Sequence, residues 1–295
     1  MISIDKFLFI INPIAGSKRN SIESLIELAD DLLPEQTKEY VYTEYPGHAA
    51  RISQHAIGKG YRAIVAAGGD GTLNEVAKAL VNTSEILGIV PLGSGNGFAR
   101  HLKIPTSPRK ALTLIRDGRC IESDVGLFNN SYFLTTCGFG FEAEVASLFS
   151  EAGSRGFWTY AWAALKGYLR YKTAFYEFSI DQRNFKTPAF FLTLANSSQF
   201  GLNARIAPTA EIDSGKMVCC KVESLNWISV PLFALRLFTG RLPRSRNYEQ
   251  YDCSAFFMDD YTGRYHIDGE PRQLESAPVH VRIMPKCLNV LAGTH

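Results

Sequence analysis

The sequence predicts a two-domain protein, with a doubly wound parallel α/β sheet in the first part of the chain and a mostly antiparallel β-domain in the second. Two observations support this prediction. Short apolar strands alternate with helical segments up to about residue 125, and closely spaced strands separated by turn signals follow. The predicted domains are residues 1–125 and 126–285, and residues 286–295 are a candidate closing strand of the first domain.

The first domain is expected to alternate strands with helices along its whole length. Its first strand is an apolar run that Asn12 and Pro13 end. Each glycine-rich turn of this region follows a strand, at the carboxyl edge where parallel sheets bind ligands. The expected elements are strand 7–11, helix 21–33, strand 39–43, helix 47–59, strand 63–67, helix 73–82, strand 86–91 and helix 107–117.

The second domain is expected to consist mainly of strands, interrupted by helical stretches at 141–171 and 226–239. Turn signals such as Asn129-Asn130 and Asp268-Gly269 separate the strands at a spacing typical of antiparallel sheets. The expected strands are 131–137, 174–180, 188–195, 216–223, 251–258, 263–267 and 279–284.

Composition argues against several classes of protein. Apolar residues make up 46% and charged residues 20% of the chain, as in a globular protein with a full core. The net charge of +2 gives no electrostatic reason to expect a nucleic acid partner. No apolar run reaches the roughly eighteen residues that a membrane span needs. The six cysteines have no CxxC spacing, which favours reduced thiols and a cytoplasmic protein.

The most informative motif is the run Gly68-Gly69-Asp70-Gly71-Thr72-Leu73-Asn74-Glu75, directly after the apolar strand 63–67. A glycine turn that opens a helix presents unpaired backbone N–H groups at the positive helix end, which is a site for phosphate. Asp70 would repel a phosphate unless a metal ion or a transferable proton lay between them. The motif therefore predicts chemistry on a nucleotide. The alternative is an ordinary turn in which Asp70 caps the helix.

Three further loops of the first domain carry candidate nucleotide ligands. Asn12-Pro13-Ile14-Ala15-Gly16-Ser17-Lys18 combines a tight turn with side-chain donors. Thr43 ends the second strand and offers a hydroxyl group. The third loop has three glycines within five residues and reads Pro91-Leu92-Gly93-Ser94-Gly95-Asn96-Gly97-Phe98-Ala99-Arg100. Alternatively these are plain turns, and Arg100 pairs with an acidic neighbour rather than a phosphate.

Carboxylates are the second kind of candidate. Asp124 follows Glu122 near the domain junction, and Asp268-Gly269-Glu270-Pro271 places two carboxylates in one turn. Together with Asp70 they supply oxygen ligands for Mg²⁺ and a base for an attacking hydroxyl, as phosphoryl transfer requires. Asp-Gly is also a common hairpin turn, and this alternative stays open.

With these motifs, the chain resembles the diacylglycerol kinase catalytic-domain family, which includes bacterial diacylglycerol kinases, sphingosine kinases and ceramide kinases. The resemblance covers nearly the whole chain. It implies an α/β nucleotide domain related to NAD kinases, then a β-sandwich, with the active site in the cleft between them. It also implies transfer of the γ-phosphoryl group of ATP to a lipid hydroxyl. The motifs are Asn12-Pro13-x-x-Gly16, Gly68-Gly69-Asp70-Gly71-Thr72, Pro91-x-Gly93-Ser94-x-Asn96 and Asp268-Gly269-Glu270-Pro271.

The resemblance also implies roles for individual residues. Glu270 corresponds to the family's proton acceptor, with Asp268 beside it, and Asp70 is a rival base in the sphingosine kinase branch. These three residues and Asp124 would share Mg²⁺ handling and proton abstraction. The residues implied to hold the nucleotide are Asn12, Pro13, Gly16, Thr43, Gly68, Gly69, Asp70, Gly71, Thr72, Leu73, Asn74, Glu75, Gly93, Ser94 and Asn96.

Two departures from the family pattern concern the lipid and a second metal. Gly97 stands where bacterial diacylglycerol kinases usually carry Asp, and the run Gly93-Ser94-Gly95-Asn96 is more similar to sphingoid-base kinases. Diacylglycerol or a related glycerolipid is the predicted acceptor, and a sphingoid base or ceramide is the alternative. Bacterial relatives also carry a structural Mg²⁺ near the turn at 211–216. Its candidate ligands here are Asp124, Glu211, Asp213 and Ser214, with Ser214 in place of the expected Asp.

Two apolar segments are candidates for membrane contact. Residues 156–172 and 227–246 combine aromatic with basic side chains, which suits anionic headgroups at a bilayer surface. The alternative is that both are core helices of the β-domain. The leading hypothesis is a lipid kinase that contacts the membrane peripherally, with a homodimer as a further option. A soluble-substrate kinase of the NAD kinase type and a nucleotide- and lipid-binding protein without turnover are the alternatives.

Overall fold

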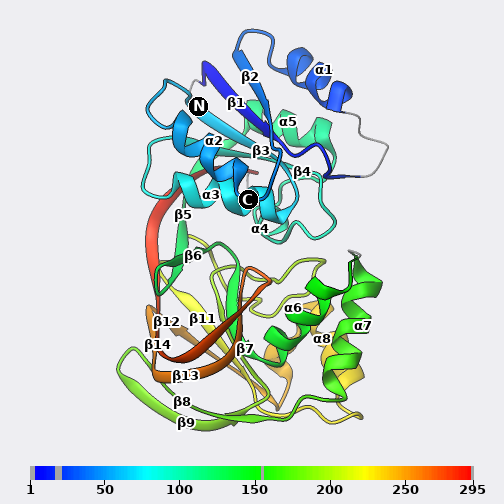
Figure 1. Cartoon of the computed structure of the whole chain (residues 1–295), viewed down its shortest axis with the longest axis vertical. Helices are drawn as coiled ribbons and strands as arrows, with labels where there is room; N and C mark the ends of the chain where they lie inside the picture. The colour runs from blue at the N-terminus through cyan, green and yellow to red at the C-terminus, as the bar shows by residue number, and fades with distance from the viewer. Residues whose placement is uncertain (1–3, 17–21, 154–155, 294–295) are drawn as a thin grey trace. The chain divides into compact units, whose positions relative to one another are not determined.

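The computed structural model describes residues 4–16, 22–153 and 156–293 (Figure 1). The chain forms two compact units. The α/β unit comprises Met1–Ser123 and Lys286–His295, and the β unit comprises Asp124–Pro285. Two strands run from one unit into the other, namely β5 (Arg119–Phe128) and β14 (Glu270–Ala292).

A parallel sheet forms the core of the α/β unit, with the strand order β2-β1-β3-β4. The last residues of β14 add a parallel strand beside β4, with Val290 opposite Leu87. Every residue of β3 is buried, as expected for a central strand of a sheet that is covered on both faces. The strands are β1 (Lys6–Ile11), β2 (Thr37–Tyr42), β3 (Ala63–Gly68) and β4 (Ile86–Pro91).

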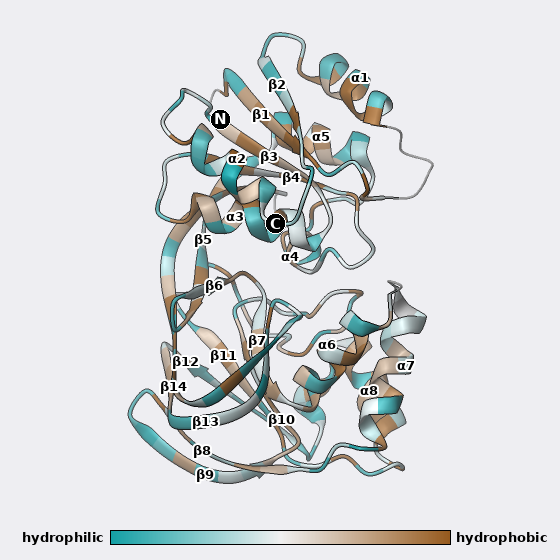
Figure 2. Ribbon diagram, viewed as in Figure 1, coloured by the Kyte–Doolittle hydropathy of each residue, from teal (hydrophilic) through white to brown (hydrophobic). Residues whose placement is uncertain are grey.

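Helices cover the two faces of this sheet. α2 packs against α3, and α1 packs against α5, so that one pair lies on each face (Figure 1). This is the doubly wound arrangement, in which crossover helices connect parallel strands. The inner strands β1, β3 and β4 are mainly apolar, whereas β2 at the edge carries polar residues (Figure 2). The helices are α1 (Ile22–Leu32), α2 (His48–Ala56), α3 (Asp70–Leu80), α4 (Gly97–His101) and α5 (Pro108–Asp117).

The alternation predicted for the first domain is confirmed, with small shifts at the element ends. The sequence predicts a helix over 73–82, whereas α3 begins at Asp70, so that the acid lies in the first helical turn. The prediction misses α4 and β5. A helix as short as α4 is too short to show periodicity, and β5 buries the polar residues Ser123 and Asp124 that a strand pattern would place outside.

An antiparallel sheet forms the β unit, with the strand order β12-β11-β10-β7-β13-β14. β8 pairs with β9 and β13, and β5 pairs with β6. Phe139 and Phe256 belong to a cluster of buried side chains that forms the main core of this unit. The strands are β6 (Ser131–Phe133), β7 (Thr136–Gly140), β8 (Ala174–Ile180), β9 (Arg183–Ala189), β10 (Phe191–Ala195), β11 (Met217–Val222), β12 (Tyr248–Cys253) and β13 (Ala255–Ile267).

The helices of the β unit correct two predicted boundaries. The sequence predicts one helical stretch over 141–171, whereas the structure has α6 (Phe141–Glu151) and α7 (Phe157–Tyr168), which pack against each other. The second predicted stretch, 226–239, contains α8 (Val230–Thr239), and a 3-10 turn (Leu242–Arg244) follows it. Within the described part of the chain, none of the helices has the length and apolarity needed to cross a bilayer.

The predicted strands of the β unit are confirmed in type but differ in extent. The segment 188–195 divides into the end of β9 and β10, and 131–137 divides between β6 and β7. The segments 263–267 and 279–284 belong to the long strands β13 and β14, which form one antiparallel hairpin. Register shifts between Met258 and Gly263 interrupt this hairpin, which is why its strands look like shorter separate runs in the sequence.

Candidate active site

The glycine turn after β3 is tied to the loop after β1. Gly69 has an extended backbone and precedes α3, which begins at Asp70. The Thr72 side chain lies against Gly68, where a Cβ atom would come within 2.7 Å of the Thr72 Cβ. Asn12 Nδ2 donates a hydrogen bond of 3.0 Å to Thr72 Oγ1. The structure therefore brings together residues of two predicted motifs at the carboxyl edge of the parallel sheet.

The loop after β4 packs directly on this turn. A Cβ atom on Gly93 would lie 2.7 Å from the Cα of Gly69, and one on Gly95 would lie 2.7 Å from Asp70 Oδ2. Real Cβ atoms almost never approach that closely, so both positions need glycine. The sequence motif includes Gly95 without assigning it a role, and the structure shows that role to be space for the Asp70 carboxylate.

The Asp70 carboxylate accepts two backbone hydrogen bonds from the loop after β4. Oδ2 accepts the N–H of Asn96 at 2.8 Å, and Oδ1 accepts the N–H of Gly97 at 2.9 Å. A carboxylate has about four acceptor positions, so these bonds leave capacity for a cation. Asn96 has a left-handed backbone and donates its side-chain amide to Gly93 O, which fixes the loop. Asp70 therefore joins two loops and keeps the donor chemistry that Mg²⁺ prefers.

The first turn of α3 is available to an anion. Gly69 is the N-cap residue of this helix, and it has no side chain that could accept a hydrogen bond from the first N–H groups. The first N–H groups of a helix have no intrahelical partner, and the helix dipole makes this end positive. Gly71 is exposed, and no atom would lie within 4 Å of a Cβ added there. A helix end with these features can bind a phosphate, and the phosphate site at this turn stays a prediction.

The other predicted nucleotide residues divide into two groups. Pro13, Gly16 and Ser94 are exposed in the loops, and the Thr43 N–H donates to Ile11 O. Ser17 and Lys18 lie outside the described residues.

Leu73 and Asn74, by contrast, are buried within the unit. The Glu75 carboxylate accepts the N–H groups of Gly47 and Ala49, at the start of α2. Glu75 thus caps a helix, a role that its place in the motif did not suggest. Arg100, which the sequence left between a phosphate and an acidic partner, donates to the Gly95 carbonyl.

In the β unit, the predicted catalytic turn is the loop of the β13–β14 hairpin. Ile267 pairs with Glu270, and the two residues between them have φ angles of 51° for Asp268 and 80° for Gly269. Two successive positive φ angles are typical of a type I′ turn, for which Asp-Gly is a preferred sequence. The ordinary Asp-Gly hairpin turn, which the sequence analysis gave as the alternative, is therefore present. The surroundings of the Asp268 and Glu270 carboxylates differ.

The Asp268 carboxylate is engaged within the β unit. Oδ1 accepts the N–H groups of Leu134 at 3.1 Å and Thr135 at 2.8 Å, and also the Thr135 hydroxyl at 2.8 Å. The Asp268 N–H in turn donates to Thr136 O. Asp268 therefore anchors the turn to the segment between β6 and β7.

The Glu270 carboxylate is accessible. Its side chain is 58% exposed, and Oε2 lies 3.8 Å from Arg272 Nη2. At that distance and exposure the Arg272 contact is weak, so the carboxylate is free to accept a proton from a bound hydroxyl. Of the two acids in this turn, Glu270 is the exposed one and has the fewer contacts.

The turn at 211–216 does not gather carboxylates around one point. Asp124 is buried, and its Oδ2 accepts the N–H of Gly215 at 2.6 Å. The Ser214 hydroxyl donates to Glu211 O, and Asp213 is exposed. Within the described residues no group of three or more His, Cys, Asp or Glu side chains could hold a metal ion. The structural Mg²⁺ site expected from Asp124, Glu211, Asp213 and Ser214 therefore stays a prediction.

Comparison with known proteins identifies the family of this chain. A model of the diacylglycerol kinase catalytic domain matches residues 6–128, and one of the YegS C-terminal NAD kinase beta sandwich-like domain matches residues 135–292. A protein named diacylglycerol kinase from Staphylococcus aureus is 31% identical over 88% of this chain and 84% of its own. A probable lipid kinase YegS-like from Chromohalobacter salexigens is 29% identical over 76% of this chain and 75% of its own. The chain belongs to the diacylglycerol kinase family.

Solved structures agree with the fold of this diacylglycerol kinase family member. A diacylglycerol kinase structure from Bacillus anthracis covers 99% of this chain and 98% of that chain, with a TM-score of 0.78 and 18% identity. A second structure from the same bacterium has a TM-score of 0.80 and 20% identity. The predicted fold class, an α/β domain followed by an NAD kinase-like β-sandwich, is confirmed, and the protein is a lipid kinase. As a kinase of this family it uses ATP.

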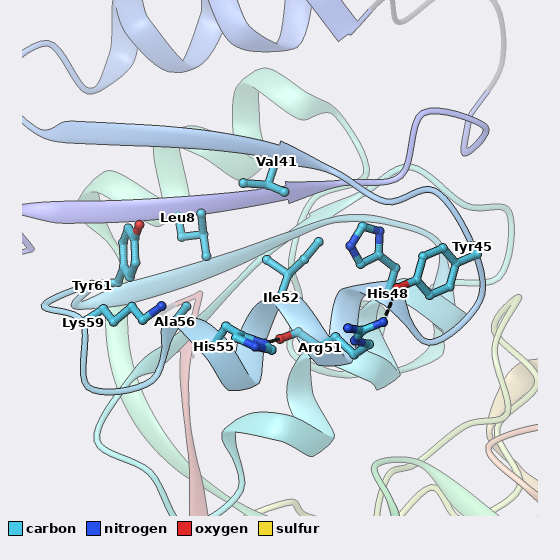
Figure 3. A pocket seen from close by; sticks show the side chains of 10 residues that line it. All are labelled: Leu8, Val41, Tyr45, His48, Arg51, Ile52, His55, Ala56, Lys59 and Tyr61. Carbon is cyan, nitrogen blue, oxygen red and sulfur yellow. Dashed lines mark hydrogen bonds between the residues drawn. The ribbon is translucent and has the colours of Figure 1, made fainter.

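A separate cavity of about 320 Å³ lies beside α2 in the α/β unit of this lipid kinase (Figure 3). Leu8, Val41 and Ile52 line its apolar part, and Arg51 and Lys59 lie among its polar lining. None of the residues predicted to bind nucleotide lines it. The sequence gives no signal for this cavity, because its lining comes from β1, β2, α2 and the connection to β3 rather than from one motif.

Proposed function

We propose that this lipid kinase transfers the γ-phosphoryl group of ATP to the hydroxyl of diacylglycerol or a related glycerolipid. One observation carries the proposal: Asp70 stands at an uncapped helix N-terminus, between two glycine loops that would admit a phosphate. The relative named diacylglycerol kinase, at 31% identity over most of both chains, supports the choice of acceptor.

The nucleotide half of the reaction is assigned to the α/β unit. The N–H groups of the first turn of α3 would hold the phosphates, with Gly71 leaving room for them. Mg²⁺ bound with ATP would neutralise phosphate charge, and the Asp70 carboxylate would help to hold it. Asn12 and Thr72, which bond to each other, fix the loop beside the phosphates.

The acceptor half is assigned to the β unit. Glu270 is exposed enough to reach a substrate and would take the proton from the attacking hydroxyl. Asp268 holds the hairpin turn through Leu134 and Thr135, so that Glu270 has a fixed position. This division of roles separates the two acids that the sequence alone left together.

The test is transfer of label from γ-labelled ATP, with Mg²⁺, to three acceptors presented separately: diacylglycerol, sphingosine and NAD. The proposal predicts label in diacylglycerol at a rate well above the other two. Preferential label in sphingosine would establish the sphingoid-base alternative, which the Gly93-Ser94-Gly95-Asn96 loop favours. Preferential label in NAD would overturn the lipid acceptor, and label in none of the three would overturn the kinase assignment for these acceptors.

We also propose that α7 and the segment 227–239, which contains α8, dock on a membrane from the cytoplasmic side, where ATP is available. Trp158 is 82% exposed and Trp227 is 77% exposed, and Leu165 and Leu235 are also exposed. Apolar residues are conspicuous on both helices (Figure 2). An exposed apolar surface of this kind is uncommon on a protein that stays in water.

Both helices are attached to the β unit and carry basic residues. Tyr168 donates its hydroxyl to Leu225 O at 3.1 Å, which ties the end of α7 to the segment before α8. Lys166 lies over the Trp162 ring, with Nζ 4.6 Å from the ring centroid. Arg170 and Lys172 follow α7, so the surface combines apolar and cationic groups as an anionic bilayer requires.

Sedimentation with vesicles tests the docking surface. The chain should bind phosphatidylglycerol-containing vesicles more tightly than phosphatidylcholine vesicles, and a Trp158→Ser/Trp227→Ser variant should lose about 10-fold or more in partitioning. Phe175→Ser, which removes an aromatic side chain on β8 that is 58% exposed, is the control and should bind normally. Equal binding by the double variant would refute this surface. The predicted homodimer is a separate proposal, which light scattering of the purified chain would test.

A further inference from the structure

A group of buried polar side chains lies behind the turn that carries Glu270. Glu142 on α6, Thr193 on β10 and His266 on β13 are 7%, 0% and 3% exposed. None belongs to a predicted motif, and the proposed reaction uses none of them. Three polar side chains buried from three different elements call for a physical reason, because an apolar core would be less costly.

The contacts form a chain that ends at the turn. Thr193 Oγ1 donates to Glu142 Oε2 at 2.7 Å, and Glu142 Oε1 lies 3.3 Å from His266 Nε2. The N–H of Gly269 donates to His266 Nδ1 at 3.3 Å. Gly269 stands between Asp268 and Glu270, so the chain of contacts reaches the centre of the hairpin loop.

These contacts fix the form of the imidazole. A backbone N–H can only donate, so the contact from Gly269 makes Nδ1 of His266 the acceptor. The proton of a neutral ring then lies on Nε2, the atom that faces the Glu142 carboxylate. Thr193 thus holds Glu142 through a hydrogen bond, the Glu142 carboxylate faces His266 Nε2 without forming a hydrogen bond to it, and His266 accepts a hydrogen bond from the turn.

The surrounding backbone is shaped to admit the carboxylate. Gly138 on β7 pairs with His266, and a Cβ atom there would lie 1.5 Å from Glu142 Oε1. Only glycine leaves the space that the carboxylate occupies. Burial raises the pKa of Glu142, whereas the His266 and Thr193 contacts lower it and offset part of that cost.

We propose that Glu142 and Thr193 hold His266 so that its imidazole positions the turn bearing Glu270. These are positioning residues, because they act through Gly269 and are not placed on the substrate. The inference rests on the proposed role of Glu270 as the proton acceptor. Asp268 secures the turn on one side through Leu134 and Thr135, and His266 secures it through Gly269.

The effect expected of this chain follows from the geometry of proton transfer. A base must lie within hydrogen-bond distance of the hydroxyl, and a shift of about 1 Å can reduce the rate about 100-fold. Loss of the His266 contact should therefore lower kcat for the lipid. It should leave KM for ATP unchanged, since the nucleotide is assigned to the α/β unit.

The test compares His266→Leu with His266→Asn. The leucine variant removes both contacts of the imidazole, whereas asparagine keeps an acceptor where Nδ1 stands. We expect the leucine variant to lose about 30- to 100-fold in kcat, and the asparagine variant to recover most of it. Val281→Ala, a core substitution on β14, is the control: it should lower the unfolding temperature and leave kcat near normal.

Hydrogen exchange of the peptide 264–272 gives a readout that needs no activity. It should quicken in His266→Leu and return toward normal in His266→Asn. Thr193→Val, which removes one hydroxyl from the chain of contacts, should produce the same change to a smaller degree. Unchanged exchange and kcat in both His266→Leu and Thr193→Val would overturn the inference, as would a leucine effect that asparagine does not reduce.

The two proposals can fail separately. If the wild-type chain phosphorylates lipid and Glu270→Gln is fully active, the base assignment fails. The positioning of the turn is then still decided by the exchange of residues 264–272. If Glu270→Gln is inactive while His266→Leu has normal kcat and normal exchange, the proposed function stands and the positioning role is refuted.

Discussion

The α/β unit and the β unit each contain a turn with an aspartate, and the hydrogen bonds of the two aspartates differ. Asp70 accepts one backbone N–H on each carboxylate oxygen, from Asn96 and Gly97. Asp268 accepts three hydrogen bonds on Oδ1, from Leu134 and Thr135, and its Oδ2 also accepts the Leu134 N–H. Asp70 thus keeps acceptor capacity at an uncapped helix end, whereas the hydrogen bonds of Asp268 anchor a hairpin turn.

The difference shows that the presence of a carboxylate in a motif does not by itself define the role of that carboxylate. Residue type and spacing nominate the aspartates of both turns equally well. The hydrogen-bond donors around each carboxylate distinguish the two aspartates. In the β unit the exposed acid is Glu270, which has only a distant contact to Arg272. We therefore assign Asp70 to the nucleotide half of the proposed reaction and Glu270 to the acceptor half.

The largest expected effect is that of Asp70→Asn. The amide would keep one acceptor and present an NH₂ group to a backbone N–H of Asn96 or Gly97, and it would lose the charge that Mg²⁺ needs. We expect kcat to fall about 1,000-fold or more. Steady-state phosphorylation of lipid measures this, and circular dichroism checks that the fold persists. Asp31→Asn, an exposed aspartate on α1, is the matched control. Near-normal turnover by Asp70→Asn would remove Asp70 from the chemistry.

Glu270→Gln should be next in size. The amide cannot accept the proton of the attacking hydroxyl, so kcat should fall about 100-fold or more. Because the side chain is 58% exposed, the unfolding temperature should stay the same. Kinetics and thermal melts measure the two quantities, with Glu275→Gln on the same strand as the control. A stability loss without a rate loss would reverse the roles of the two acids in this turn.

Asp268→Asn should behave in the opposite way. It weakens the bonds to Leu134 and Thr135, so the free energy of unfolding should fall by about 1 to 3 kcal/mol. The rate should fall only about 10-fold, through looser placement of Glu270. Chemical denaturation measures the stability change. If Asp268→Asn were fully stable and as inactive as Glu270→Gln, the contrast between anchor and base would be lost.

The smallest expected effect concerns Glu142, the buried acid behind the β-unit turn. Burial raises its pKa above the ordinary value of 4.5, so the folded state binds a proton more tightly than the unfolded state. The free energy of unfolding then falls as the pH rises from 4.5 through the raised pKa. Glu142→Gln should remove this part of the pH dependence. Melts across this range would show equal slopes for the two proteins if the linkage were absent.

Much of the fold is predictable because it depends on local pattern. The β3 run is apolar throughout and is buried throughout, so its place in the centre of the sheet can be inferred from five neighbouring residues. Helix α3 and the glycine turn before it can be predicted from the residues that directly follow this strand. By contrast, α4 is only five residues long and β5 buries Asp124, so neither shows a usable period.

The roles of several residues in the site could not be predicted from the sequence, because they depend on contacts between residues far apart in the chain. Glu75 belongs to the glycine motif, yet it caps α2 through Gly47 and Ala49. The His266–Glu142 contact joins residues far apart in the chain, and no motif contains both. Sequence spacing can nominate a carboxylate, but its hydrogen-bond donors come from other elements and appear only in the folded chain.

The most direct test of the account is the affinity for ATP, measured by calorimetry without lipid, for Gly71→Ala and Glu270→Gln. A Cβ at Gly71 meets no atom of the protein, so the fold should persist while the phosphates lose their room. We expect Gly71→Ala to bind ATP about 10-fold or more weakly, whereas Glu270→Gln should bind ATP as the wild type does. Normal ATP binding by Gly71→Ala, or weakened binding by Glu270→Gln, would contradict the division of the reaction between the two turns.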